Sequence, residues 1–144
     1  MNKYISSLIG GVIATVILSI LMIIKMQMGL LPQFNVIADM TDIAGAQTPI
    51  IGWAMHLVLG IIIWGLLFAI VSHLFKGPYS VKGIQFGILL WFLMMIIYMP
   101  VTENGFFASH LGYPVMLASL ILHIIYGFFL GLFTGLIYKD KSTQ

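Results

Sequence analysis

The chain contains no cysteine among its 144 residues. Disulfides, iron–sulfur clusters, thiolate zinc sites and cysteine nucleophiles are therefore all excluded. Arginine is missing too, and the positive charge rests on six lysines that are scattered along the sequence. Such a distribution does not make a nucleic-acid surface, so no nucleic-acid partner is expected.

Charge of either sign is scarce, since only 7% of the residues are charged and 61% are hydrophobic. The mean hydropathy is +1.12. A soluble domain of this size lacks the means to cover its surface with so few charges, so an integral membrane protein is expected, with the lipid bilayer as its first partner. The length predicts a single membrane domain over residues 1–144 with no room for a soluble catalytic domain.

Long apolar runs are what the chain does have. A transmembrane helix needs about 20 residues, and four segments meet that length: residues 5–25, 50–75, 81–100 and 114–138. The predicted fold class is all-α, a bundle of four transmembrane helices.

The few charges are distributed unevenly between the two sides of such a bundle. Lysine is enriched in cytoplasmic loops of membrane proteins. One side would carry Lys3, Lys76, Lys82, Lys139 and Lys141, and the other would carry Lys25, Asp39, Asp42 and Glu103. The sequence therefore predicts a multi-pass protein with both termini in the cytoplasm.

The two halves of the sequence share a pattern. "ILMIIKM" (residues 20–26) closes the first span, "LMMIIYM" (residues 93–99) closes the third, and each is followed by an outer loop and a span that contains H-x-x-x-G. This favours a 2+2 parallel internal repeat. Small residues at spacings of four, such as Ser7, Gly11 and Thr15 in the first span, mark the faces where helices are expected to pack.

Both outer loops have features of short interfacial helices. In the first loop Asn35, Asp39 and Asp42 share one helical face, which is an amphipathic pattern suited to the bilayer surface. In the second loop, "TENGFFASHLGYP" (residues 102–114) predicts a short helix that ends at Gly112 and Pro114.

Two histidines stand inside apolar spans, in "GWAMHLVLG" (residues 52–60) and "LILHIIYGFFLG" (residues 120–131). His56 and His123 are expected at similar depth, and each precedes a glycine by four residues, Gly60 and Gly127. Ionisable residues within a membrane usually face the bundle interior and mark functional sites. The alternative is that each neutral imidazole bonds a neighbouring helix and only fixes packing.

Ligation by His56 and His123 would suit haem b or a transition metal. Two imidazoles supply both axial ligands of a haem, and the two glycines leave room for a flat macrocycle beside Trp91, Met95 and Met99. Copper is a weaker candidate that rests on the many methionine thioethers near the outer side. Binding of no cofactor at all is a third interpretation.

No catalytic constellation is recognisable, and no carboxylate lies within a predicted span. The protein is therefore not expected to be an enzyme. The favoured interpretation is a small accessory or cofactor-binding subunit. The alternatives are a transporter or channel with a histidine-lined outer vestibule, and a structural subunit that packs against other membrane subunits or a second copy of itself.

At the two histidine segments, "GWAMHLVLG" and "LASLILHIIYGFFLGL" (residues 117–132), the sequence resembles a family of small four-span bacterial inner-membrane proteins of unknown function, distantly YagU-like. The resemblance implies a four-helix fold and a location in the bacterial inner membrane. It implies no activity, cofactor or site residue.

Overall fold

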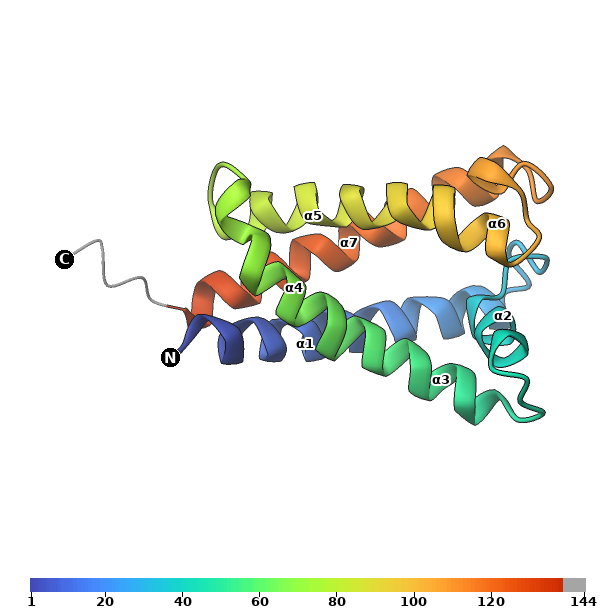
Figure 1. Cartoon of the computed structure of the whole chain (residues 1–144), viewed down its shortest axis with the longest axis horizontal. Helices are drawn as coiled ribbons and strands as arrows, with labels where there is room; N and C mark the ends of the chain where they lie inside the picture. The colour runs from blue at the N-terminus through green and yellow to red at the C-terminus, as the bar shows by residue number, and fades with distance from the viewer. Residues whose placement is uncertain (139–144) are drawn as a thin grey trace.

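Four long helical rods run along the longest axis of the computed structural model, which describes residues 1–138 (Figure 1). The first rod is α1 (Lys3–Gln27), and the second joins α3 (Pro49–Leu57), the π-helical segment η1 (Val58–Ile63), α4 (Trp64–Val71) and the 3₁₀ turn η2 (Ser72–Leu74). The third joins α5 (Tyr79–Leu93), the π-helical segment η3 (Met94–Tyr98) and α6 (Met99–Val101), and the fourth is α7 (Tyr113–Ile137). All four are long and apolar enough to cross a membrane. Their boundaries agree with the four predicted segments to within two residues.

Local sequence explains where the rods begin. The Asn2 side chain accepts a hydrogen bond from the backbone N–H of Tyr4, 2.8 Å away, and so caps α1. Thr48 caps α3 just before Pro49, and Pro114 lies in the first turn of α7, where a missing N–H costs nothing. Pro114 therefore starts the last span.

The start of α1 and the end of α7 lie at the same end of the bundle (Figure 1). We call this the terminal end. The opposite end, which holds the loops of residues 28–48 and 102–112, is called the cap end. The loop that joins η2 to α5 returns the chain at the terminal end.

The first and second rods pack through the small residues of α1. The Ser7 hydroxyl donates a hydrogen bond to the carbonyl of Gly65 at 2.7 Å, and a Cβ on Gly60 would collide with the Thr15 side chain. Close approach through small residues is the usual way in which helices associate in lipid. The small-residue face predicted for the first span is confirmed.

The third and fourth rods approach even more closely. A Cβ on Gly83 would collide with the Gly127 carbonyl oxygen, and one on Gly127 would collide with that of Gly83. A Cβ on Gly87 would meet the His123 carbonyl. The four-residue glycine spacing of both helices therefore forms one continuous backbone contact.

The bundle is closed at its terminal end and divided at its cap end. Phe68, Phe86 and Leu130 are fully buried at the terminal end, with the rings of Phe68 and Phe86 5.3 Å apart. Towards the cap end the second and third rods diverge, while α7 lies against both α1 and α5 (Figure 1). A 2+2 repeat would make the interface between the second and third rods equivalent to the interface between the fourth and first rods. The fourth rod packs against the first, whereas the second and third rods separate, so the two interfaces are not equivalent.

The two outer loops differ from each other. The first contains α2 (Val36–Ile43), which packs over the start of α3: a Cβ on Gly52 would collide with the Ile37 carbonyl. The second contains only the three-residue 3₁₀ turn η4 (Phe106–Ala108) instead of the expected helix. Gly105, Phe107 and Ala108 all have positive φ, which prevents a helix from continuing.

Candidate functional site

A cavity of about 290 Å³ lies between the cap-end halves of the four rods. This volume is close to the lower limit of small-molecule pockets. Most of its wall is apolar, and every span contributes, as do the loop after α1 and the start of α2. The residues that line it include His56, Leu59, Gly60, Trp64, Leu93, Met94, Ser119, Leu122, His123 and Tyr126.

The loop after α1 covers the cavity at the cap end. Phe34 is buried, and its carbonyl accepts a hydrogen bond from the Lys25 ammonium, which also bonds the Leu31 carbonyl at 3.2 Å. The same ammonium lies 5.0 Å from the centre of the Phe34 ring. Lys25 therefore ties the covering loop to the end of α1.

A second connection joins this cover to the third span. The Tyr98 hydroxyl lies 3.4 Å from the Val36 carbonyl and 3.5 Å from the Asp39 carboxylate, and both are long contacts. Burial raises the pKa of the Asp39 carboxyl, the hydrogen bond from Tyr98 opposes this rise, and the charge of Asp42 adds to it. The cover thus contacts both rods that diverge beneath it.

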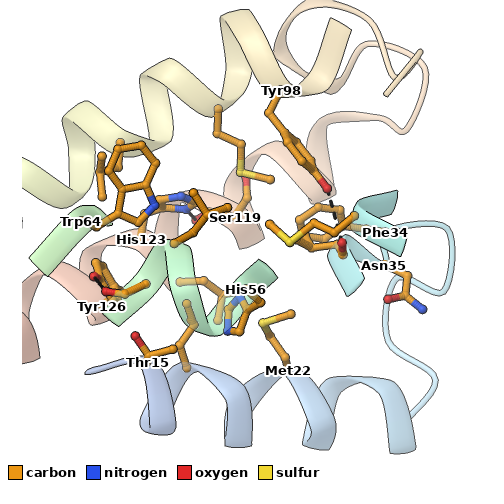
Figure 2. A pocket seen from close by; sticks show the side chains of 18 of the residues that line it. Thr15, Met22, Phe34, Asn35, His56, Trp64, Tyr98, Ser119, His123 and Tyr126 are labelled. Atoms are coloured by element: carbon orange, nitrogen blue, oxygen red, sulfur yellow. Dashed lines mark hydrogen bonds between the residues drawn. The ribbon is translucent and has the colours of Figure 1, made fainter. Parts of the chain in front are cut away.

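His123 enters the cavity from α7 (Figure 2). Its Nδ1 lies 2.8 Å from the carbonyl oxygen of Ser119, one turn earlier in the same helix. A carbonyl only accepts, so Nδ1 carries the hydrogen and Nε2 carries a lone pair. Within residues 1–138 no group forms a hydrogen bond with Nε2. His123 lines the cavity and is only partly buried, and its Nε2 keeps some accessible surface.

His56 enters the same cavity from α3, and its ring is almost fully buried (Figure 2). Its Nε2 lies 3.2 Å from the Ser19 hydroxyl, and that hydroxyl gives its single hydrogen to the Thr15 carbonyl at 2.7 Å. With that hydrogen on the Thr15 carbonyl, Nε2 is assigned as the donor towards Ser19, and the lone pair is assigned to Nδ1. Both histidines thus keep one accepting nitrogen without a protein partner in the described chain.

The remaining polar groups on the wall are mostly engaged. The Tyr126 hydroxyl donates to the Gly60 carbonyl at 2.6 Å, and the Ser119 hydroxyl donates to the Met116 carbonyl at 2.9 Å. The Thr15 hydroxyl, beside that of Tyr126, has no partner of good hydrogen-bond geometry. The Trp64 indole N–H has no partner among residues 1–138 and remains accessible.

Both π-helical segments border the cavity. Leu59 and Gly60 belong to η1, and Met94 and Tyr98 belong to η3. Single-turn π segments inside α-helices are rare and occur frequently at functional sites. Hydropathy does not distinguish π-helical from α-helical segments, so the sequence does not predict either one.

The structure brings together only part of the predicted site. His56, His123 and Gly60 line the cavity, whereas Gly127 faces Gly83 on α5. Met95 and Met99 are fully buried in a separate cluster with Phe34, Ala108 and Val115. The Trp91 indole lies beside that cluster and donates to the Met116 carbonyl and the Ser119 hydroxyl, each at 3.2 Å. None of these four residues lines the cavity.

The donors available to a metal are few. Among residues 1–138 no group of three His, Asp or Glu side chains is placed to hold a metal ion. The two imidazoles share the cavity with the thioethers of Met22, Met26, Met40 and Met94. Of the two histidines, His123 has the arrangement typical of a metal ligand, with one nitrogen bonded to a carbonyl and the other free.

A comparison with known protein families decides where the chain belongs. The model of a family of unknown function, DUF6789, matches residues 1–144. The chain belongs to this family. No curated protein and no solved structure matches it. The resemblance to YagU-like proteins stays a prediction.

Proposed function

We propose that this DUF6789 protein is a non-catalytic membrane protein that binds a small lipophilic molecule in the cavity between its four spans. The observation that carries the proposal is an apolar cavity between the four rods, lined by two histidines that each keep an unbonded accepting nitrogen. Polar atoms in a membrane interior are costly unless they are paired. A bound molecule that pairs with them accounts for both the cavity and its polar atoms.

The proposed route of entry is lateral, from the bilayer. The cover formed by Phe34, Lys25 and α2 closes the cap end, and the cluster of Phe68 and Phe86 closes the terminal end. The second and third rods diverge between these closures, with Leu59 on one side and Leu93 on the other. A molecule dissolved in lipid would reach the cavity between these two helices.

The cellular setting belongs to the same proposal. The lysine distribution supports a terminal end in the cytoplasm, with the cavity in the outer half of a bacterial inner membrane. The bound molecule would then be held near the outer leaflet. An accessory role beside other membrane subunits, or in a homo-oligomer, is compatible with the exposed apolar faces of all four spans.

Photolabelling of the purified protein in nanodiscs tests this proposal. We expect an alkylphenyl diazirine to label peptides that contain Leu59, Leu93 or Leu122, and excess non-photoactive 4-decylphenol to suppress this labelling. The lipid-facing surface should label without saturation. Uniform labelling that excess competitor does not reduce would show that no binding site exists.

Two neighbouring positions on α7 provide the matched control. Leu122 lines the cavity, whereas Ile121 is 57% exposed and points away from the bundle. Leu122→Trp should fill the cavity and abolish competable labelling, and Ile121→Trp should leave it unchanged. If both variants label like the wild type, the ligand lies elsewhere.

A metal-centred cofactor, haem b or copper, is the second candidate, and the free Nε2 of His123 is the observation that favours it. A second ligand from His56 requires either its Nδ1 or a break of the bond to Ser19. Bound iron would supply a redox-active centre, and the residues present fit one histidine ligand better than two.

A Soret band or a stoichiometric metal content that His123→Ala removes and His73→Ala retains would support this candidate. A colourless, metal-free protein after expression with ample haem and copper would refute it.

Transport is the less favoured alternative. A path from the cavity to the terminal end would have to cross the layer of Phe68, Phe86 and Leu130, whose side chains are fully buried. Flux through proteoliposomes that responds to His56→Ala would favour a transporter over a binding protein.

A further inference from the structure

The atoms that face the cavity specify the chemistry of the molecule it would hold, and this deduction rests on the proposed function. In the described chain, the unbonded nitrogens of His123 and His56 are both acceptors, because each ring has its hydrogen engaged elsewhere. The unbonded N–H of Trp64 is a donor on the same wall. A complementary head group must donate to an imidazole and can accept from the indole.

We infer that the cavity takes a membrane-dissolved alcohol or phenol, with its hydroxyl hydrogen-bonded to Nε2 of His123 and its apolar body directed between the second and third spans. A hydroxyl both donates and accepts, so one group satisfies an imidazole nitrogen and the indole N–H. Ketones, quinones, esters and ethers lack the hydrogen that His123 requires. The cavity thus selects a reduced, hydroxylated head over its oxidised or alkylated counterpart.

The rest of the wall agrees with this assignment. The hydroxyls of Ser119, Tyr126 and Tyr98 donate to backbone carbonyls, and Lys25 is bonded to the cover. The Thr15 hydroxyl has no partner of good geometry, and its oxygen is fully buried in the wall. Leu59, Leu93, Met94 and Leu122 offer only apolar contacts to the body of the ligand. No lining carboxylate is present within residues 1–138, so the site has no counter-ion for a cationic amine.

The experiment compares 4-decylphenol with its methyl ether, 4-decylanisole, as competitors of the diazirine probe in nanodiscs. The ether keeps the ring, the chain and the accepting oxygen, and lacks only the hydrogen. One hydrogen bond corresponds to about a three- to tenfold difference in affinity. We expect the phenol to bind tighter by that factor, after correction for partition into protein-free nanodiscs.

His123→Phe locates the hydrogen bond because the ring stays and its nitrogens are lost. The phenol-to-ether ratio should fall close to one in this variant and stay unchanged in His73→Phe, whose histidine is exposed at the terminal end and bonds its own helix. Equal affinity of both competitors for the wild type would overturn the inference and leave the proposed function standing. A ratio that survives in His123→Phe would overturn the assignment to His123, and failure of both competitors would overturn the proposed function itself.

Discussion

At the scale of single residues, hydrogen bonds between distant segments explain how the cavity keeps its shape. The Tyr126 hydroxyl crosses from α7 to the carbonyl of Gly60 in the π segment η1, and both groups are buried. An unpaired buried carbonyl costs about 1–3 kcal/mol. Tyr126 therefore secures the irregular stretch of the second span at the cavity wall.

Tyr126→Phe should lower the free energy of unfolding by about 1–3 kcal/mol, because the Gly60 carbonyl loses its donor while the ring remains. Unfolding in mixed micelles, followed by circular dichroism, measures the change. Tyr113→Phe is the control, since that tyrosine is 67% exposed. Equal stability of the two variants would show that the bond to Gly60 contributes nothing.

The two histidines show how much of the site can be predicted from single residues of the sequence. Their place in apolar spans, and the preference of such residues for bundle interiors, was enough to predict that His56 and His123 face the interior. Which nitrogen of each ring stays free depends on Ser19 and on the Ser119 carbonyl. Trp64 was not predicted as a polar wall residue, because its unpaired N–H is evident only once its neighbours are known.

At the scale of elements, backbone contacts between α5 and α7 set the position of the last span. Gly127→Ala should lower the free energy of unfolding by about 1–3 kcal/mol, because the added Cβ would collide with the Gly83 carbonyl oxygen and overpacking forces backbone shifts. Gly65→Ala is the matched control in α4, where the nearest atom to an added Cβ is 3.3 Å away. The same unfolding assay compares them. A Gly127→Ala variant as stable as Gly65→Ala would contradict the close contact.

The covering loop is an element that the Lys25 side chain ties to the end of α1. Lys25→Met should release the loop of residues 28–35, because two carbonyls lose their ammonium donor while the apolar stem is kept. Hydrogen–deuterium exchange should then become faster in this loop and at the start of α2. Lys3→Met, at the terminal end, should change nothing there, and unchanged exchange in the Lys25 variant would show that Phe34 packing alone holds the cover.

The elements also show the limits of hydropathy. Length and apolar content predicted all four spans, because lipid requires continuous helices of that length. The π segments η1 and η3 remained hidden, since a shift of hydrogen-bond register changes no residue type. The helix in the second loop is only a three-residue 3₁₀ turn, and composition does not reveal the positive φ of Phe107 and Ala108 that limits it.

At the scale of the whole molecule, the cavity lies in one half of the bundle only, so orientation in the membrane decides which leaflet would supply the proposed ligand. The lysine distribution predicts that the cap end faces outwards. The chain has no cysteine, so a single cysteine can be placed anywhere without background. Gln33 and Ser109 are exposed at the cap end, and Lys76 is exposed beside η2 at the terminal end.

Gln33→Cys and Ser109→Cys should react with a membrane-impermeant maleimide in intact cells, whereas Lys76→Cys should react only after the membrane is opened. The physical reason is that a charged maleimide does not cross the hydrocarbon core, so labelling reports the side directly. Mass shift on a gel measures the labelled fraction, and detergent-solubilised samples confirm that all three thiols are reactive. Labelling of Lys76→Cys alone in intact cells would reverse the orientation, place the cavity in the inner half of the membrane and make the cytoplasmic leaflet the source of its ligand.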